Sequence, residues 1–156
     1  YAQDNETSWL DWKLAESPEG QALTKFTARV IALRHRHGVL RAPRFLHGQD
    51  KVVDGIGDIA WFDAAGEQIS NESWNNPGEH RLVLRRAGRD DGGISILTAF
   101  FNATGEDHRF RLPPPGLPTR LLLNTANPDA EESDLEIEEI VVGAHSVVLT
   151  LSTRKV

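Results

Sequence analysis

Apolar residues recur at helical intervals between residues 18 and 37. They follow one another at spacings of three and four, which places them on one face of an α-helix. The repeat consists of Leu23, Phe26, Val30, Leu33 and His37, with Ala22, Thr27 and Ile31 beside it. Most of the positions between them are polar or small. The pattern therefore predicts an amphipathic helix with one buried face.

Both ends of this stretch carry the residues typical of helix boundaries. Ser17 can accept a hydrogen bond from a free backbone N–H, and Pro18 suits the first helical position. Residues 34–36 are basic, which is favourable at the negative end of the helix dipole. Gly38 can take the left-handed conformation that ends many helices. We expect the helix to end there.

The pattern changes after the helix. Residues 41–57 contain one proline and three glycines among charged residues, and they predict an irregular connector with a short extended piece at 51–53. Residues 58–62 have strand composition, residues 63–66 form a turn, and residues 67–69 return as a hairpin. The polar stretch 71–78 is expected to be a loop or a single helical turn.

Period-two alternation dominates the rest of the chain. Strands are predicted at 81–87, 94–102, 108–112, 119–124, 135–142 and 146–151. Within the second of these, Ile94, Ile96 and Phe100 should share one face. Turns rich in Gly, Pro and Asp separate the strands, and the turn at 88–93 lacks the alternating oxygen ligands of a calcium loop. These features predict an antiparallel β-sandwich.

Several stretches of this sequence are similar to one family. They are QDNETSWLDW, FTARVIALRHRHGVLR, GDIAWFDAAGEQISNESW, LTAFFNATGEDHRFRLP and AHSVVLTL. Together they closely resemble the bacterial glycogen debranching enzymes and isoamylases of the alpha-amylase family. The resemblance implies that residues 1–40 are the loop and last helix of a truncated (β/α)8 barrel. Residues 41–57 would be a connector, and residues 58–156 a C-terminal antiparallel β-sandwich domain.

The resemblance also implies a reaction for a larger parent protein. Enzymes of this family hydrolyse α-1,6 branch linkages in glycogen or limit dextrin. They retain the anomeric configuration and use a carboxylate nucleophile and a carboxylic acid. Those acids project from barrel strands that precede the last helix, and none of the motifs that hold them occurs in this sequence. We therefore assign no catalytic residue and expect this segment alone to be inactive. Its role would be to stabilise the barrel.

The first loop holds the candidate substrate-binding residues. The resemblance places it at the C-terminal face of the barrel, where active sites of this fold lie. The candidates are Asp4, Asn5, Glu6, Trp9 and Trp12. In the alternative interpretation, the two tryptophans pack under the barrel rim and the acids satisfy loop backbone groups.

Two further tryptophans lie in the predicted β-domain. Trp61 falls within a strand and Trp74 in the polar stretch after it. They could form a sugar platform, which needs an exposed indole face, or they could be packing residues, which is commoner for strand aromatics. Two other functions therefore stay open: a glucan-binding β-sandwich module, and a stand-alone β-sandwich interaction domain.

Composition limits the partners, the compartment and the metal sites that this chain could have. The 156 residues carry a formal net charge of -6, which argues against a nucleic-acid partner, and no apolar run approaches bilayer length. The absence of cysteine excludes thiolate metal sites and fits a reducing, cytoplasmic compartment. None of the six histidines, including His47, is paired with another histidine or a carboxylate at a spacing typical of metal ligands. We therefore predict no metal and no cofactor. The expected partners are an α-glucan, the barrel domain and, through the exposed helix face, a second copy of the segment.

Overall fold

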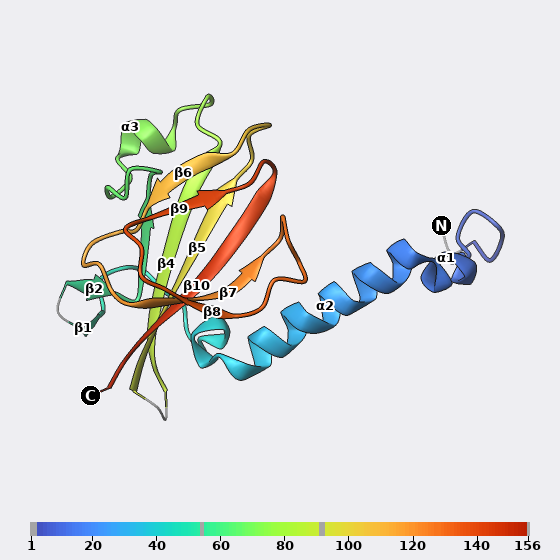
Figure 1. Cartoon of the computed structure of the whole chain (residues 1–156), viewed down its shortest axis with the longest axis horizontal. Helices are drawn as coiled ribbons and strands as arrows, with labels where there is room; N and C mark the ends of the chain where they lie inside the picture. The colour runs from blue at the N-terminus through green and yellow to red at the C-terminus, as the bar shows by residue number, and fades with distance from the viewer. Residues whose placement is uncertain (1–2, 54, 91–92, 156) are drawn as a thin grey trace. The chain divides into compact units, whose positions relative to one another are not determined.

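A computed structural model describes residues 3–53, 55–90 and 93–155. Contacts divide the chain into two compact units, Tyr1–Arg36 and His37–Val156. Most of the α-helices and strands of both units are labelled in Figure 1. None of the helices in the described residues is long and apolar enough to cross a membrane.

The first unit contains two helices, α1 (Trp12–Glu16) and α2 (Pro18–Arg36). The predicted start of α2 is confirmed, because the Gly20 backbone N–H donates to Ser17 Oγ at 3.1 Å. The short helix α1 was not predicted, although Asp11 caps it by accepting from the Lys13 N–H at 3.0 Å. Along α2, Leu23 and Val30 expose 65% and 39% of their surface. Much of the predicted apolar stripe is therefore exposed.

The prediction for Gly38 is wrong. Gly38 does not have a positive φ and instead opens the 3-10 helix η1 (Gly38–Arg41). The preceding residue, His37, has φ -109° and ψ 108°, so the chain leaves α2 through an extended residue. An extended residue at that point removes the need for a left-handed cap. Val39 is buried in the second unit.

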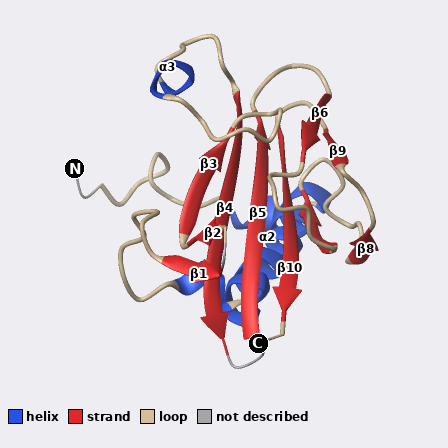
Figure 2. Ribbon diagram, turned by 90° about the vertical axis from the view of Figure 1, so that its left-hand side faces the viewer, coloured by secondary structure: helices blue, strands red, loops and turns tan. Residues whose placement is uncertain are grey.

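The second unit is built on one large antiparallel sheet. Its six strands lie in the order β3 (Ile59–Phe62), β4 (Arg81–Asp90), β5 (Gly93–Asn102), β10 (Ser146–Arg154), β7 (Thr119–Asn124) and β8 (Ser133–Leu135). A second, two-stranded sheet pairs β6 (His108–Arg111) with β9 (Glu139–Val142), and a third pairs β1 (Lys51–Val53) with β2 (Ile56–Gly57). Figure 2 shows the long central strands side by side, with β6 next to β9.

The main core lies between the large sheet and the β6–β9 sheet. The large sheet contributes Phe62, Val83, Phe100 and Val148, and the small sheet contributes Phe110 and Val142. Phe100 and Phe110 meet edge to face across the two layers, with ring centroids 6.0 Å apart. Two antiparallel layers closed by one apolar core form the predicted β-sandwich, and that prediction is confirmed.

A second cluster fills one end of the sandwich. It contains Val52, Ile56, Ala87, Ile94 and Ile96. The predicted shared face of Ile94, Ile96 and Phe100 agrees with the strand register, since Ile96 lies opposite Ala87 and Phe100 opposite Val83, which alternate onto one face of β4. The short hairpin β1–β2 packs its own apolar residues on this end, which anchors the connector that leads into β3.

The strand predicted at 135–142 is wrong in one respect, because it is two strands. β8 pairs with β7 in the large sheet, whereas β9 pairs with β6 in the small one. Glu136, Ile137 and Glu138 are exposed and carry the chain between the layers. Their alternation of acids and an apolar residue is the pattern of a continuous strand, although none of these three residues belongs to a strand ladder of either sheet.

The other boundaries differ by a few residues. β4 continues beyond residue 87 to Asp90, and of the predicted turn at 88–93, residues 91 and 92 lie outside the described residues. The predicted hairpin return at 67–69 is reduced to one bridge between Phe62 and Gln68, because β3 pairs with β4. The polar stretch after it forms the single turn α3 (Asn71–Trp74), capped by Ser70.

Candidate functional site

The predicted loop brings Asp4 and Trp9 together. The indole N–H of Trp9 donates to Asp4 Oδ1 at 2.6 Å, and 61% of the Trp9 surface is exposed. The Asn5 side chain turns the loop, since its Oδ1 accepts from the Thr7 N–H at 3.1 Å. The loop therefore presents a tryptophan whose ring orientation is fixed by a carboxylate.

The other two candidates of this loop lie apart from that pair. Glu6 is exposed within the turn, and Trp12 begins α1 with 73% of its surface exposed. Both tryptophans thus offer apolar ring surface to solvent in this unit. The assignment of Asp4, Asn5, Glu6, Trp9 and Trp12 to substrate binding stays a prediction.

Trp61 and Trp74 contact each other in the second unit. Their ring centroids lie 5.5 Å apart in an edge-to-face arrangement. Trp61 is half-buried on β3, whereas Trp74 on α3 exposes 53% of its surface. The pair combines packing with an exposed ring, so it has features of both interpretations given above.

A pocket of about 760 Å³ opens beside Trp61. Its walls come from the loop at residues 46–49, from β3, from residues 66–69 and from Pro114. Polar residues from three places line it: His47 and Gln49 from the loop, Glu67 and Gln68 from the segment after β3, and Arg85 from β4. A volume of this size lies within the range of ligand pockets, about 300–1,000 Å³.

Arg85 is an unusual residue in this pocket. It lies on β4 with only 6% of its surface exposed, and its Nη1 donates to the Pro114 carbonyl at 2.6 Å. Its guanidinium carbon lies 4.7 Å from the centre of the Phe62 ring, a cation–π geometry. Its Nε has no hydrogen-bond partner among the described residues. Burial lowers the pKa of Arg85 from its ordinary value, and within the described part of the chain no carboxylate raises it again.

The sequence interpretation missed Arg85. The residue occupies an inward position between Val83 and Ala87, both of which are buried. Strand alternation alone marks that position as interior, so an arginine there was the available signal.

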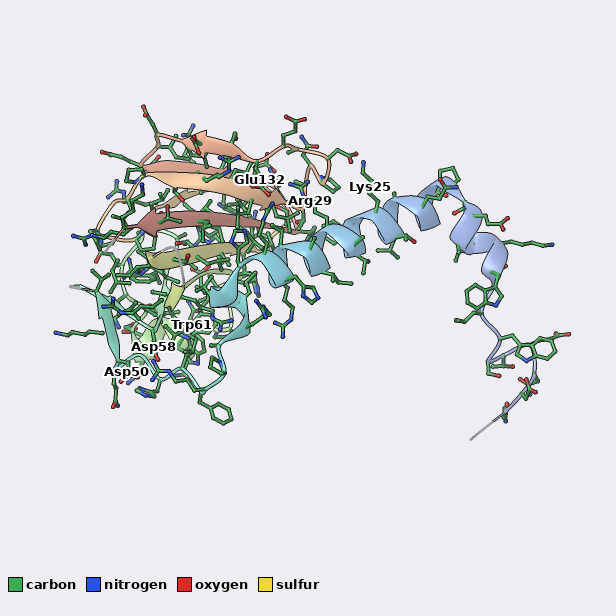
Figure 3. The ribbon with its side chains drawn as sticks, turned by 90° about the horizontal axis from the view of Figure 1, so that it is seen from below. Lys25, Arg29, Asp50, Asp58, Trp61 and Glu132 are labelled. Carbon is green, nitrogen blue, oxygen red and sulfur yellow. The ribbon has the colours of Figure 1, made fainter. Side chains whose placement is uncertain are left out.

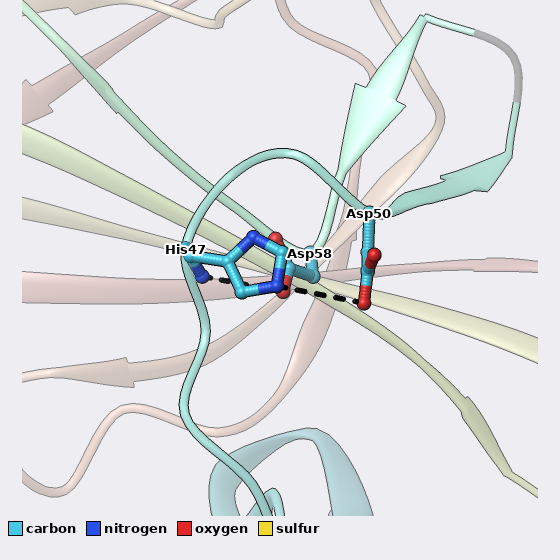
Figure 4. Close-up of side chains that lie close together, drawn as sticks. All are labelled: His47, Asp50 and Asp58. Carbon is cyan, nitrogen blue, oxygen red and sulfur yellow. Dashed lines mark hydrogen bonds and ion pairs between the residues drawn. The ribbon is translucent and has the colours of Figure 1, made fainter.

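His47, Asp50 and Asp58 form a second cluster, where the connector at residues 41–57 leads into β3 (Figure 4). One ligand-type atom from each lies within 4.8 Å of the others. The expectation that His47 stands apart from carboxylates is therefore wrong. The tight turn at residues 47–50 places His47 Nε2 3.8 Å from Asp50 Oδ2, and Asp58 comes from the start of β3, where no sequence spacing could reveal it.

Other groups of the protein already bind the carboxylate oxygens of this cluster. Asp58 is 1% exposed and accepts from the backbone N–H of Gly48 at 2.8 Å, of Ile59 at 2.9 Å and of His47 at 3.4 Å. Asp50 pairs with the guanidinium of Arg44. A cation would have to compete with both arrangements, so the cluster is explained as a device that closes the 47–58 loop.

The pKa of Asp58 follows from the same contacts. Burial raises this pKa, but the hydrogen bonds from Gly48, His47 and Ile59, with the nearby His47 ring, outweigh burial and lower the pKa below its ordinary value. Asp58 is thus held as a carboxylate. Figure 3 places Asp58, Asp50 and Trp61 in the second unit, where the loop that Asp58 fixes also forms a wall of the pocket beside Trp61.

The chain is similar to proteins named for glycogen metabolism. No protein-family profile matches it. The glycogen operon protein GlgX homolog of Mycobacterium tuberculosis is 36% identical over 75 residues, which are 47% of this chain and 10% of that protein. The glycogen debranching enzyme of Erwinia tasmaniensis is 35% identical over 85 residues, 54% of this chain and 11% of the enzyme.

A longer match extends the similarity. The glycogen debranching enzyme of Pectobacterium carotovorum is 31% identical over 113 residues, which are 72% of this chain. In each of these proteins the matched segment spans only 10 to 14% of the relative's own length. The resemblance indicated by the sequence is confirmed, and this chain is homologous to part of the glycogen debranching enzymes.

Proposed function

We propose that this chain is a non-catalytic segment of a glycogen debranching enzyme. The whole protein would hydrolyse α-1,6-glucosidic branch linkages in glycogen or limit dextrin, with a (β/α)8 barrel that α2 and the β-sandwich stabilise. Similarity of 31–36% over 47–72% of the chain carries this proposal. The α-glucan would reach the chain through the whole enzyme, in the cytoplasm.

The one carboxylate cluster of the second unit described above, Asp50 and Asp58, supports a non-catalytic role. A retaining glycosidase needs a nucleophilic carboxylate and an acid about 5 Å away, both facing a substrate cleft. The buried carboxylate Asp58 accepts three backbone hydrogen bonds and faces its own loop. Asp50, its neighbour, is paired with Arg44. Neither group is available to attack or protonate a sugar.

The exposed side of α2 supports a contact with a further domain. Leu23 and Ile31 expose 65% and 52% of their surface, and Val30 exposes 39%. Burying each such side chain contributes about 1.5–3 kcal/mol by transfer estimates, which are upper bounds. A barrel packed on this face would gain that contribution, and in isolated chains the face would favour self-association.

The test compares this chain with the product of its full reading frame. Both would be incubated with phosphorylase limit dextrin, and released reducing sugar would be measured. We expect release from the full-length protein and none from the chain. In the full-length protein, Leu23→Asp with Val30→Asp should lower the melting temperature, whereas Lys13→Asp on exposed α1 serves as the control. Sugar release by the chain alone, or an unchanged melting temperature, would overturn the proposal.

A further inference from the structure

The large sheet carries apolar side chains on both of its faces. One face forms the main core and includes Val83, Phe100 and Val148. Residues that alternate with these along the same strands point to the opposite side of the sheet. The strand register brings a set of them onto one continuous surface: Trp61, Leu82, Leu84, Ala99, Phe101, Val147 and Leu149. We call these residues the outer apolar face, and the strands that carry them lie side by side in Figure 2.

The outer apolar face is only half covered. All of its residues are half-buried except Ala99, which is 2% exposed and pairs with the larger Leu84 and Leu149 on either side. Beside it, Trp74 of α3 contacts Trp61 edge to face at 5.5 Å and exposes 53% of its surface. In a β-sandwich the outward positions of a strand are usually polar. Contiguous apolar surface at such positions marks a place where another protein surface packs.

The other end of the same sheet face is already packed within the second unit. There Val39 of η1 covers Gly88, since the Cα and Cγ2 atoms of Val39 lie 3.9 Å from where a Gly88 Cβ would be. Val39 itself is 7% exposed. Gly88 follows Leu82 and Leu84 on the same side of β4, so the outer apolar face continues a surface that is covered at one end.

We propose that the outer apolar face, together with Trp74, is the surface through which the β-sandwich docks on the remainder of the whole enzyme. The inference rests on the proposed function, since it names the part of the β-sandwich that would meet the barrel. The matched segment is only 10 to 14% of each relative's length, so most of a relative's chain lies outside it and can supply this cover. The partner surface would be apolar and uncharged, as the cores of protein interfaces are.

The size of the face favours a partner in the same polypeptide. A stable interface between separate proteins takes about 20–30 residues from each side, far more than this face provides. A domain of the same chain is held at a high effective concentration, so a smaller contact is enough. The side chains of the face also lack acceptors for sugar hydroxyls, because their polar groups are the indole N–H donors of Trp61 and Trp74.

The first test is hydroxyl-radical footprinting of this chain and of the product of its full reading frame, read by mass spectrometry. We expect Trp74 and Phe101 to be oxidised about fivefold more slowly in the full-length protein, because a packed interface excludes water. Val141 is the control. It is 52% exposed on β9 and alternates with the buried Val142, so it faces outward on the far side of the sandwich. Its labelling should not change.

The second test is a matched pair of substitutions. Val147→Lys places a charge on the outer apolar face, and Val141→Lys makes the same chemical change on the far side. In this chain alone the melting temperatures of the two variants should agree within about 2 °C. In the full-length protein Val147→Lys should melt about 3 °C or more below Val141→Lys, because the charge would be buried at the interface. Circular dichroism checks that each variant is folded.

Three results would overturn the inference. They are equal oxidation of Trp74 in the two proteins, equal melting of the two lysine variants of the full-length protein, and protection of Trp74 in this chain alone that grows with its concentration. The last result would mark a second copy as the occupant. Each of them leaves the limit-dextrin comparison and the Leu23/Val30 melting experiment untouched. Failure here is therefore distinguishable from failure of the proposed function.

Discussion

Asp58 Oδ1 lies 2.8 Å from the backbone nitrogen of Gly48, and this contact joins the start of β3 to a loop ten residues earlier. The same oxygen accepts from the Ile59 N–H at 2.9 Å. The backbone reinforces the link, since the Asp58 N–H donates to the Asp50 carbonyl at 2.9 Å. A single buried carboxylate thus fixes one wall of the pocket beside Trp61.

Replacing Asp58 should destabilise the β-sandwich. Asp58→Ala leaves the N–H groups of Gly48 and Ile59 without their acceptor, and we expect a loss of about 3 kcal/mol in the free energy of unfolding. Asp58→Asn keeps an acceptor oxygen and should cost less. Urea denaturation measures both, and Asp134→Ala, at a side chain that is 83% exposed, is the control. A change below about 0.5 kcal/mol for Asp58→Ala would contradict this account.

Stability should fall in acid partly because of the same residue. The folded-state pKa of Asp58 lies below its ordinary value, so its contribution to stability is present above the unfolded pKa of about 3.9 and is lost as pH falls through the folded pKa. Glu79, hydrogen-bonded by the Arg81 side chain, has a lowered pKa and acts in the same direction. Unfolding measured from pH 7 to pH 2 should show the difference between wild type and Asp58→Asn shrinking in acid. A constant difference would exclude this linkage.

Local signals in the sequence predicted much of the fold. The Ser17-Pro18 boundary fixed the start of α2, and the apolar residues of β5 marked a buried strand, because each depends on neighbours close in the chain. The predictions of a left-handed Gly38 and of a single strand at 135–142 were wrong for the opposite reason. Whether a glycine needs a positive φ, or an alternating segment joins one sheet or two, depends on where distant strands lie.

The candidate sites also differ in whether their contacts join residues near one another in the sequence or far apart. Asp4 and Trp9 are five residues apart, and the hydrogen bond between them lies within the loop that the sequence identified. Arg85 and Pro114 are 29 residues apart, and Asp58 reaches back to His47 and Gly48. Composition places a charged residue on the surface by default. Only the packed sheet reveals that Arg85 is buried beside a pocket.

The contact between the two layers should dominate core stability. Phe110 is fully buried and meets Phe100 edge to face at 6.0 Å. Phe110→Ala should lower the free energy of unfolding by about 3–5 kcal/mol, because it removes buried surface and leaves a cavity. Phe45→Ala makes the same chemical change at a residue that is 96% exposed, and it should have little effect. Equal effects of the two substitutions in urea denaturation would refute the assigned core.

Asn102, 2% exposed at the end of β5, gives the sharpest test of a buried polar network. Its Nδ2 faces the carbonyl oxygens of Glu106, Val142 and Gly143 at 2.8, 3.0 and 2.9 Å, and its Oδ1 accepts from the Thr104 N–H at 3.0 Å. Asn102→Asp keeps the size of the side chain but turns a carboxylate oxygen toward three carbonyls.

At pH 7 Asn102→Asp should therefore cost about 4 kcal/mol of stability, the range of an uncompensated buried charge. The introduced carboxyl has no donors on its carbonyl-facing side, so its folded pKa should be raised, and the deficit should shrink as pH falls and the group becomes protonated. Asn124→Asp is the matched control, because Asn124 Oδ1 already accepts from the Ala126 N–H at 3.0 Å and a carboxylate can do the same. Urea denaturation at pH 7 and pH 4 measures both variants. A loss for Asn102→Asp that does not change with pH would mean that the amide serves shape rather than hydrogen-bond donation.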